Sequence, residues 1–276
     1  MQKIKLIALD LDGTTLDNKS QLLPRTKAVL ERAIADGIHV VLASGRAYET
    51  FPEEVLKIQG LSYIVTSNGA ATIDPKTGDR AFTFSLTAEK VDAIGRLLSK
   101  DLQQEMEVFY RGVPYVSYCY YENPTEFGIP ERNVPYIKRT RKPIGDSRTF
   151  LAGHRNEIDS IDLICSDMDK KKGLEEELRE IGGLYLTSSM AFRLEISDEK
   201  SGKGAALKKV AGLLSVEPEE IVAFGNADND VDMMLYAGLG VAVANSPESV
   251  KKQADRIAPS NEEEGVAQVL EELLGY

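Results

Sequence analysis

The stretch IKLIALDLDGTTLD, residues 4–17, joins an apolar run to two carboxylates. The run has the composition of a buried strand, and Asp10 and Asp12 come at its end. Residues two apart in a strand point the same way, so both carboxylates can reach one pocket. Asp-x-Asp alone is most often a solvated turn. Burying an unpaired carboxylate costs several kcal/mol, so after a buried strand we expect positive charge beside these two.

Outward from this stretch, short apolar runs alternate with helical patterns, which predicts a parallel sheet covered by helices. Further strands are expected at 38–45, 62–70, 221–226 and 240–245, and helices at 26–37 and 230–238. Four polar residues then fall at strand ends, namely Asp10, Ser44, Asn68 and Asn226. Ligands of open α/β sheets gather at the carboxyl ends of the strands, so these positions indicate a site.

The middle of the chain, from about 83 to 190, has a different pattern. Helices are expected at 87–100 and 171–182, and the segment 122–143 is the most loop-like part of the chain. The alternation in VPYVSYCYY, residues 113–121, is typical of a half-exposed antiparallel strand. This segment is therefore interpreted as an α+β domain inserted into the α/β domain.

Composition limits the classes of function. Lys and Arg number 33 against 44 Asp and Glu in 276 residues, a formal net charge of −11. This argues against nonspecific nucleic-acid binding and against an anionic membrane surface. No apolar segment approaches bilayer length, and the first apolar run is too short for a signal peptide. The cysteines Cys119 and Cys165 lack metal-ligand spacing, and we expect a cytoplasmic protein.

Three more stretches carry polar groups suited to an anion. LASGR, residues 42–46, ends a strand with a hydroxyl, an accessible backbone N–H and a cation, although a simple helix cap by Ser44 is the alternative. Lys203 stands at a helix start, where a cation is disfavoured unless an anion also binds. GNADND, residues 225–230, places several carboxylates and amides just past a strand.

In this order, DLDGT, ASGR, SGKGAAL and GNADND resemble the four motifs of the haloacid dehalogenase-like (HAD) superfamily. The stretches TSNGA and MLYAGLGVAVANS resemble its Cof-type branch of small-molecule phosphatases. The resemblance implies a Rossmann-like parallel-sheet core formed by residues 1–83 and 190–276. It also implies that residues 84–189 form an inserted α/β cap that sets substrate specificity.

The resemblance further implies a phosphoaspartyl mechanism, with Asp10 as nucleophile and Asp12 as general acid and base. The groups that would hold the phosphoryl oxygens are the Leu11 backbone N–H, Ser44, the Gly45 backbone, Lys203 and Asn229. The groups that would hold Mg²⁺ are the Asp10 side chain, the Asp12 backbone carbonyl, Asn226 and Asp230, the last directly or through a water. Arg46 is a candidate substrate contact that would point toward the cap, and cap specificity is left open among Arg111, Tyr115, Tyr118 and Tyr121.

Asn226 departs from the family pattern, which usually has Asp there. Either the enzyme is active with a weakened metal site, or the protein binds phosphorylated ligands without turning them over. We expect the active enzyme, a phosphomonoesterase for small phosphorylated metabolites such as sugar phosphates, nucleotides or phosphorylated cofactors. A phosphomutase is an alternative within the same chemistry. A Rossmann dinucleotide binder is discounted, because no Gly-x-Gly-x-x-Gly follows the first strand.

Overall fold

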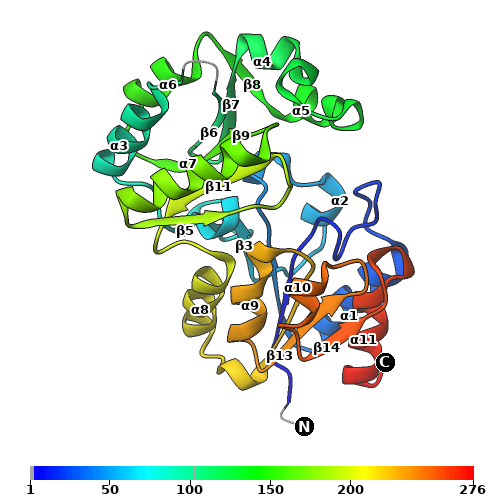
Figure 1. The fold of residues 1–276 in the computed structure, drawn as a ribbon. Coiled ribbons are helices and arrows are strands. Elements are labelled where there is room, and N and C mark those ends of the chain that lie inside the picture. Colours follow the sequence, from blue (N-terminus) through cyan, green and yellow to red (C-terminus); the bar gives the residue numbers. More distant parts are fainter. Residues whose placement is uncertain (1–2, 102–103) are drawn as a thin grey trace. The chain divides into compact units, whose positions relative to one another are not determined.

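The computed structural model describes residues 3–101 and 104–276, and the chain forms two compact units (Figure 1). Unit 1 comprises Met1–Arg46, Phe51–Phe82 and Gly202–Tyr276, and unit 2 comprises Ala47–Thr50 and Thr83–Ser201. Each unit is built around a β-sheet of its own.

The sheet of unit 1 has β1 near its middle. Its strands, in spatial order, are β14 (Arg256–Ala258), β13 (Leu239–Val243), β12 (Ile221–Gly225), β1 (Leu6–Leu9), β2 (His39–Ala43), β3 (Tyr63–Thr66), β4 (Ala71–Ile73) and β5 (Arg80–Thr83). Pairing is parallel from β14 to β3, and β4 runs antiparallel to β3. Parallel pairing brings the carboxyl ends of β1, β2, β3 and β12 to one edge, as the sequence predicts.

Helices cover both faces of this sheet. They are α1 (Pro24–Ala35), α2 (Glu53–Leu56), α8 (Lys203–Leu214), α9 (Val231–Tyr236), α10 (Glu248–Lys251) and α11 (Gly265–Leu274). One face of β1 packs against α8 and α9, and α1 lies beside α11 on the other side (Figure 1). A strand buried on both faces reads as a continuous apolar run, which explains the uninterrupted apolar sequence of β1.

Unit 2 is an α+β unit with a mostly antiparallel sheet. Its strands, in spatial order, are β10 (Leu184–Thr187), β11 (Arg193–Asp198), β9 (Ile158–Ile164), β6 (Glu105–Tyr110), β7 (Val113–Ser117) and β8 (Lys142–Ile144). Its helices are α3 (Ala88–Leu98), α4 (Tyr118–Glu122), α5 (Val134–Thr140), α6 (Ser147–Gly153) and α7 (Met168–Ile181). Only the β7–β8 pair is parallel among the pairings described within this sheet.

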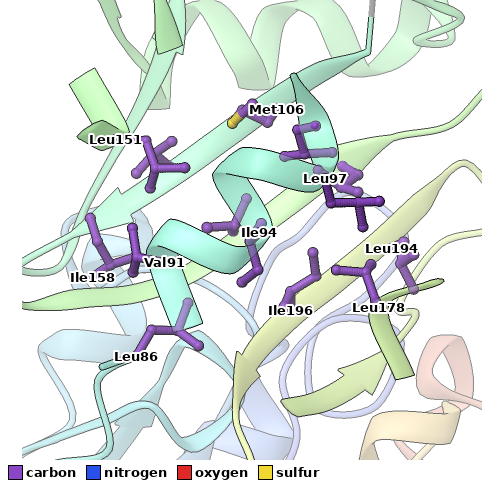
Figure 2. Close-up of a cluster of buried hydrophobic side chains, with 14 of the residues drawn as sticks. Leu86, Val91, Ile94, Leu97, Met106, Leu151, Ile158, Leu178, Leu194 and Ile196 are labelled. Atoms are coloured by element: carbon purple, nitrogen blue, oxygen red, sulfur yellow. The ribbon is translucent and has the colours of Figure 1, made fainter. Parts of the chain in front are cut away.

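One face of the unit 2 sheet carries a hydrophobic core. Ile94 of α3, Leu151 of α6 and Leu178 of α7 pack there against side chains of β6, β9 and β11 (Figure 2). Alternate residues of the same strands point to the opposite face, where Glu107, Asp162 and other charged side chains are buried. Unit 2 therefore has a core separate from the helix-covered core of unit 1.

Short 3₁₀ helices complete the described structure. They are η1 (Tyr48–Thr50), η2 (Ser67–Gly69), η3 (Pro124–Phe127), η4 (Glu131–Asn133), η5 (Pro218–Glu220), η6 (Asp228–Asp230) and η7 (Asn261–Glu263). Within the described residues, no helix has both the length and the apolar character that crossing a membrane requires.

Unit 2 differs from the sequence-based expectation in three places. The strand expected over 113–121 ends at Ser117, because the Ser117 hydroxyl accepts a hydrogen bond from Tyr120 N (3.1 Å) and caps α4. The expected loop over 122–143 contains α5. The expected boundary at 189 falls between β10 and β11, and the pairing of these two strands with each other keeps both in unit 2.

Candidate active site

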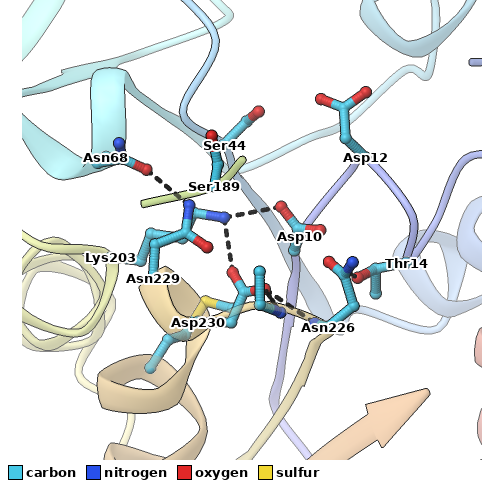
Figure 3. Close-up of polar contacts among 12 residues, drawn as sticks. Asp10, Asp12, Thr14, Ser44, Asn68, Ser189, Lys203, Asn226, Asn229 and Asp230 are labelled. Carbon is cyan, nitrogen blue, oxygen red and sulfur yellow. Dashed lines mark hydrogen bonds and ion pairs between the residues drawn. The ribbon is translucent and has the colours of Figure 1, made fainter. Parts of the chain in front are cut away.

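The first strand ends in a tight turn that holds Asp10 at the edge of the unit 1 sheet. Asp10 N still donates to Phe224 O of β12 (3.0 Å), as a strand residue does. The chain then folds back, and Leu11 O accepts from the backbone N–H groups of Thr15 (3.0 Å) and Leu16 (2.9 Å). Gly13 has a φ of +79°, which favours glycine. The turn separates the two carboxylates, and Figure 3 shows Asp12 directed away from Asp10.

Lys203 supplies the positive charge expected beside the strand end. As the first residue of α8, it places its Nζ 2.7 Å from Asp10 Oδ1 and 2.6 Å from Asp230 Oδ1 (Figure 3). All three side chains are almost completely buried. Two buried carboxylates are thus joined by one ammonium group, and each partner offsets the desolvation cost of the others.

This pairing sets the protonation behaviour of the cluster. Burial and the nearby Asp230 raise the pKa of the Asp10 carboxyl to about 7, although Lys203 acts to lower it. Burial would lower the pKa of the Lys203 ammonium, but Asp10 and Asp230 raise it above its ordinary value. Lys203 therefore stays charged at neutral pH.

Asp12 is paired with Arg46. The Arg46 guanidinium donates from Nε to Asp12 Oδ2 (2.7 Å) and from an Nη to Asp12 Oδ1 (2.6 Å). This two-point geometry fixes the carboxylate plane. The sequence predicts Arg46 as a candidate substrate contact, and in the structure its guanidinium holds Asp12.

Asn226 lies against the Asp10 and Asp12 segment. With its amide oriented to satisfy its neighbours, Asn226 Nδ2 lies 3.1 Å from both Asp10 Oδ2 and the Asp12 carbonyl oxygen, and 3.0 Å from Thr14 Oγ1. Asp230 faces elsewhere, because its Oδ2 accepts from Asn226 N (2.8 Å) and Ala227 N (2.9 Å). Asp230 thereby caps η6 in addition to binding Lys203.

The residues predicted to hold phosphoryl oxygens also belong to this edge. Ser44 follows β2, is buried, and its Oγ accepts from Arg46 N (3.2 Å). Asn229, in η6, donates from Nδ2 to Asn68 Oδ1 (2.9 Å). A Cβ at Gly45 would lie 3.1 Å from the same Asn68 oxygen. Asn68 follows a predicted strand but has no predicted role, and the Asn68-Gly69 pair is the sequence signal for a turn there.

The sequence of this chain matches a known protein family. The family described as haloacid dehalogenase-like hydrolase matches residues 7–270. The chain belongs to this family. The prediction made from the four motifs, of a HAD-type phosphatase with a parallel-sheet core and an inserted α+β domain, is confirmed.

Relatives of this HAD-like hydrolase are named phosphatases. The phosphatase YwpJ of Bacillus subtilis is 30% identical, over 98% of this chain and 100% of its own length. The 5-amino-6-(5-phospho-D-ribitylamino)uracil phosphatase YwtE of the same organism is 30% identical, over 98% of both chains. A solved HAD-like hydrolase of B. subtilis is 28% identical, covers 97% of this chain and 99% of its own, and superposes with a TM-score of 0.82.

The donor set of this HAD-like hydrolase fits a hard cation at one place. Asp10 Oδ2 and the Asp12 carbonyl oxygen both face the Asn226 amide, and turning that amide over would present three oxygens to one point. This set carries only the Asp10 charge. No group of three His, Cys, Asp or Glu side chains that could hold a metal lies together anywhere in residues 3–101 and 104–276. The site fits Mg²⁺ as an oxygen site of low charge.

Proposed function

We propose that this chain is a Mg²⁺-dependent phosphomonoesterase for small phosphorylated metabolites, acting through a phosphoaspartyl intermediate on Asp10. The observation that carries the proposal is the buried Asp10–Lys203–Asp230 cluster at the carboxyl edge of the parallel sheet. Lys203 binds Asp10 Oδ1, and Asp10 Oδ2 lies on the side of Asn226. The ammonium group thus holds one Asp10 oxygen, and the Asn226 amide contacts the other.

In the first half-reaction, an Asp10 carboxylate oxygen attacks phosphorus and the bond from phosphorus to the ester oxygen breaks. Asp12 donates its proton to that leaving oxygen, which departs as an alcohol. The Lys203 ammonium and the Asn229 amide lower the repulsion between Asp10 and the phosphoryl oxygens. Both Asp12 carboxylate oxygens accept hydrogen bonds from the Arg46 guanidinium, so the Asp12 carboxyl has to leave Arg46 before it can reach the leaving oxygen.

In the second half-reaction, ionised Asp12 removes a proton from water. The resulting hydroxide attacks phosphorus, the bond to Asp10 breaks, and inorganic phosphate leaves. The two hydrogen bonds from Arg46 fix the orientation of the Asp12 carboxylate. Arg46 is therefore a positioning residue for Asp12.

Mg²⁺ would be held by the Asp10 side chain, the Asp12 backbone carbonyl and Asn226, and it supplies positive charge next to the phosphoryl oxygens. Asp230 would contribute through Lys203 and the η6 backbone, since those groups already use both its oxygens. Small substrates are supported by the relative YwtE, which is named a 5-amino-6-(5-phospho-D-ribitylamino)uracil phosphatase.

The test is release of p-nitrophenol from p-nitrophenyl phosphate with and without Mg²⁺. We expect metal-dependent release, and Asp10→Asn should lower kcat by about 10³-fold or more, because it removes the nucleophile. Asp79→Asn, an exposed position in unit 1, is the matched control and should leave kcat unchanged.

A non-catalytic phosphate-binding protein is the competing function, and the neutral Asn226 is the feature that favours it. Calorimetric binding of phosphorylated metabolites, without release from any of them in the presence of Mg²⁺, would establish that alternative. Equal activity of Asp10→Asn and wild type would remove Asp10 from the mechanism.

A further inference from the structure

The turn after β3 has an unusual backbone. Ser67 (φ 48°), Asn68 (φ 51°) and Gly69 (φ 91°) are all in the left-handed region. Left-handed residues other than glycine cost free energy, least for Asn and Asp. Two of them in succession persist only where surrounding contacts hold them.

Three contacts of Asn68 hold this turn, and each reaches a different segment of the active site. Asn68 N donates to Ser44 O (3.1 Å), and Asn68 O accepts from Gly202 N (2.8 Å), the residue before Lys203. Asn68 Oδ1 accepts from Asn229 Nδ2 (2.9 Å; Figure 3). One residue thus joins the segments that carry Ser44, Lys203 and Asn229.

The packing around the turn leaves no room to adjust. A Cβ at Gly69 would lie 2.2 Å from Gly202 O, and a Cβ at Gly45 would lie 3.1 Å from Asn68 Oδ1. Asn68 itself is 5% exposed. The turn, the Ser44 segment and the start of α8 are therefore in direct contact around this side chain.

The side-chain bond decides which end of the Asn229 amide faces which neighbour. An amide can present its oxygen or its nitrogen in the same place, and only hydrogen-bond partners distinguish the two orientations. In the structure Asn68 presents its Oδ1, an acceptor, to the Asn229 nitrogen. One N–H of that nitrogen is bound to Asn68, and the second N–H of the same nitrogen remains for an anion.

We propose that Asn68 is a positioning residue that orients the Asn229 amide as a donor to the phosphoryl group and fixes it relative to Ser44 and Lys203. This inference rests on the proposed function, since it assigns Asn229 to the phosphoryl oxygens. Asn68 acts through Asn229 and contacts no reacting atom in this assignment.

The experiment is a double-mutant cycle. Asn68→Gly removes the side chain while glycine keeps the left-handed backbone, and Asn68→Ser, which is too short to reach Asn229, is a second truncation. Each is combined with Asn229→Ala. Ser215→Gly, at a left-handed residue after α8 (φ 55°), controls for glycine at such a position. KM and kcat for p-nitrophenyl phosphate and the calorimetric Kd for inorganic phosphate are measured for every variant.

Asn68→Gly and Asn68→Ser should each weaken phosphate binding about tenfold, as loss of one hydrogen bond to a charged group does. In the Asn229→Ala background the same changes should have less than about a twofold effect, because the residue through which Asn68 acts is absent. Ser215→Gly should match the wild type. Losses that multiply in the double variants would overturn the proposal, as would wild-type phosphate binding in both single variants.

Failure of the proposed function gives a different result. A wild type that binds phosphate but releases no p-nitrophenol overturns the phosphatase assignment, while the cycle is still decided from the Kd values. A wild type that neither binds phosphate nor hydrolyses the ester overturns both.

Discussion

The side-chain amide of Asn226 contacts both groups that are proposed to hold Mg²⁺. Its amide nitrogen lies 3.1 Å from Asp10 Oδ2 and from the Asp12 carbonyl oxygen, so it donates to the two groups proposed to hold Mg²⁺. When no cation is bound, the Asn226 amide donates hydrogen bonds to these two oxygens. A carboxylate at 226 would instead add negative charge at the same point.

Asn226→Asp should tighten Mg²⁺ binding about tenfold or more, because the added charge strengthens a hard-cation site. The measurements are the calorimetric Kd for Mg²⁺ and the Mg²⁺ concentration that gives half-maximal release of p-nitrophenol. Unchanged values in both would indicate that Asp230 carries the metal dependence.

At the scale of elements, β6, β9 and β11 bring three carboxylates into one row. Glu107 lies opposite Asp162, and Asp162 lies opposite Glu195. Burial acts to raise the pKa of Glu107, but Arg141 and Arg193 lower it to about 2. Burial and the neighbouring Glu195 raise the pKa of Asp162 well above its ordinary value of 3.8. The same row therefore contains one carboxylate paired with two guanidinium groups, Glu107, and one paired with Arg193 alone, Asp162, for which burial outweighs the pairing.

Asp162→Asn should stabilise unit 2 at neutral and alkaline pH. Asp162 binds a proton more tightly in the folded chain than in the unfolded chain. The resulting stabilisation is fully present below about pH 3.8 and is lost as the pH rises through the raised folded pKa. The Asn side chain carries no charge to bury, so the difference between variant and wild type should grow from pH 4 to pH 8 in urea unfolding. A constant difference would contradict the prediction.

Glu107→Gln is the matched comparison. It should cost about 3–5 kcal/mol at neutral pH, because Arg141 and Arg193 lose a buried carboxylate. The stabilisation by Glu107 is present above its ordinary pKa of 4.5 and is lost as the pH falls toward 2, the opposite trend to Asp162.

At the scale of the whole molecule, the two units have separate hydrophobic cores. Cooperative two-state unfolding is expected of small single domains and commonly fails in chains with more than one core. The chain crosses between the units at 46/47, 50/51, 82/83 and 201/202.

We therefore expect calorimetry to resolve two unfolding transitions. Leu6→Ala, in the fully buried β1, should destabilise unit 1 by about 2–5 kcal/mol and lower one transition. Glu107→Gln should lower the midpoint temperature of the other transition, that of unit 2. A single transition that both variants shift equally would show that the units unfold together.

The sequence predicts the strand ends well, because parallel pairing sends the residues that follow β1, β2 and β12 to one edge. It does not predict the Arg46–Asp12 pair, which depends on how the turn after Asp10 directs each side chain. The strand expected to reach residue 121 is wrong because the Ser117 cap outweighs the apolar alternation. The positioning role proposed for Asn68 depends on its contacts with three segments that are distant in sequence, so the sequence alone does not indicate that role.

The ammonium bridge between Asp10 and Asp230 has a thermodynamic consequence. Up to two carboxylate charges face one lysine charge there, so an arriving phosphate dianion increases an existing excess of negative charge. A divalent cation reduces that excess, and the anion in turn favours binding of the cation. Linkage makes the two effects equal: whatever factor phosphate contributes to the affinity for the cation, the cation contributes to the affinity for phosphate.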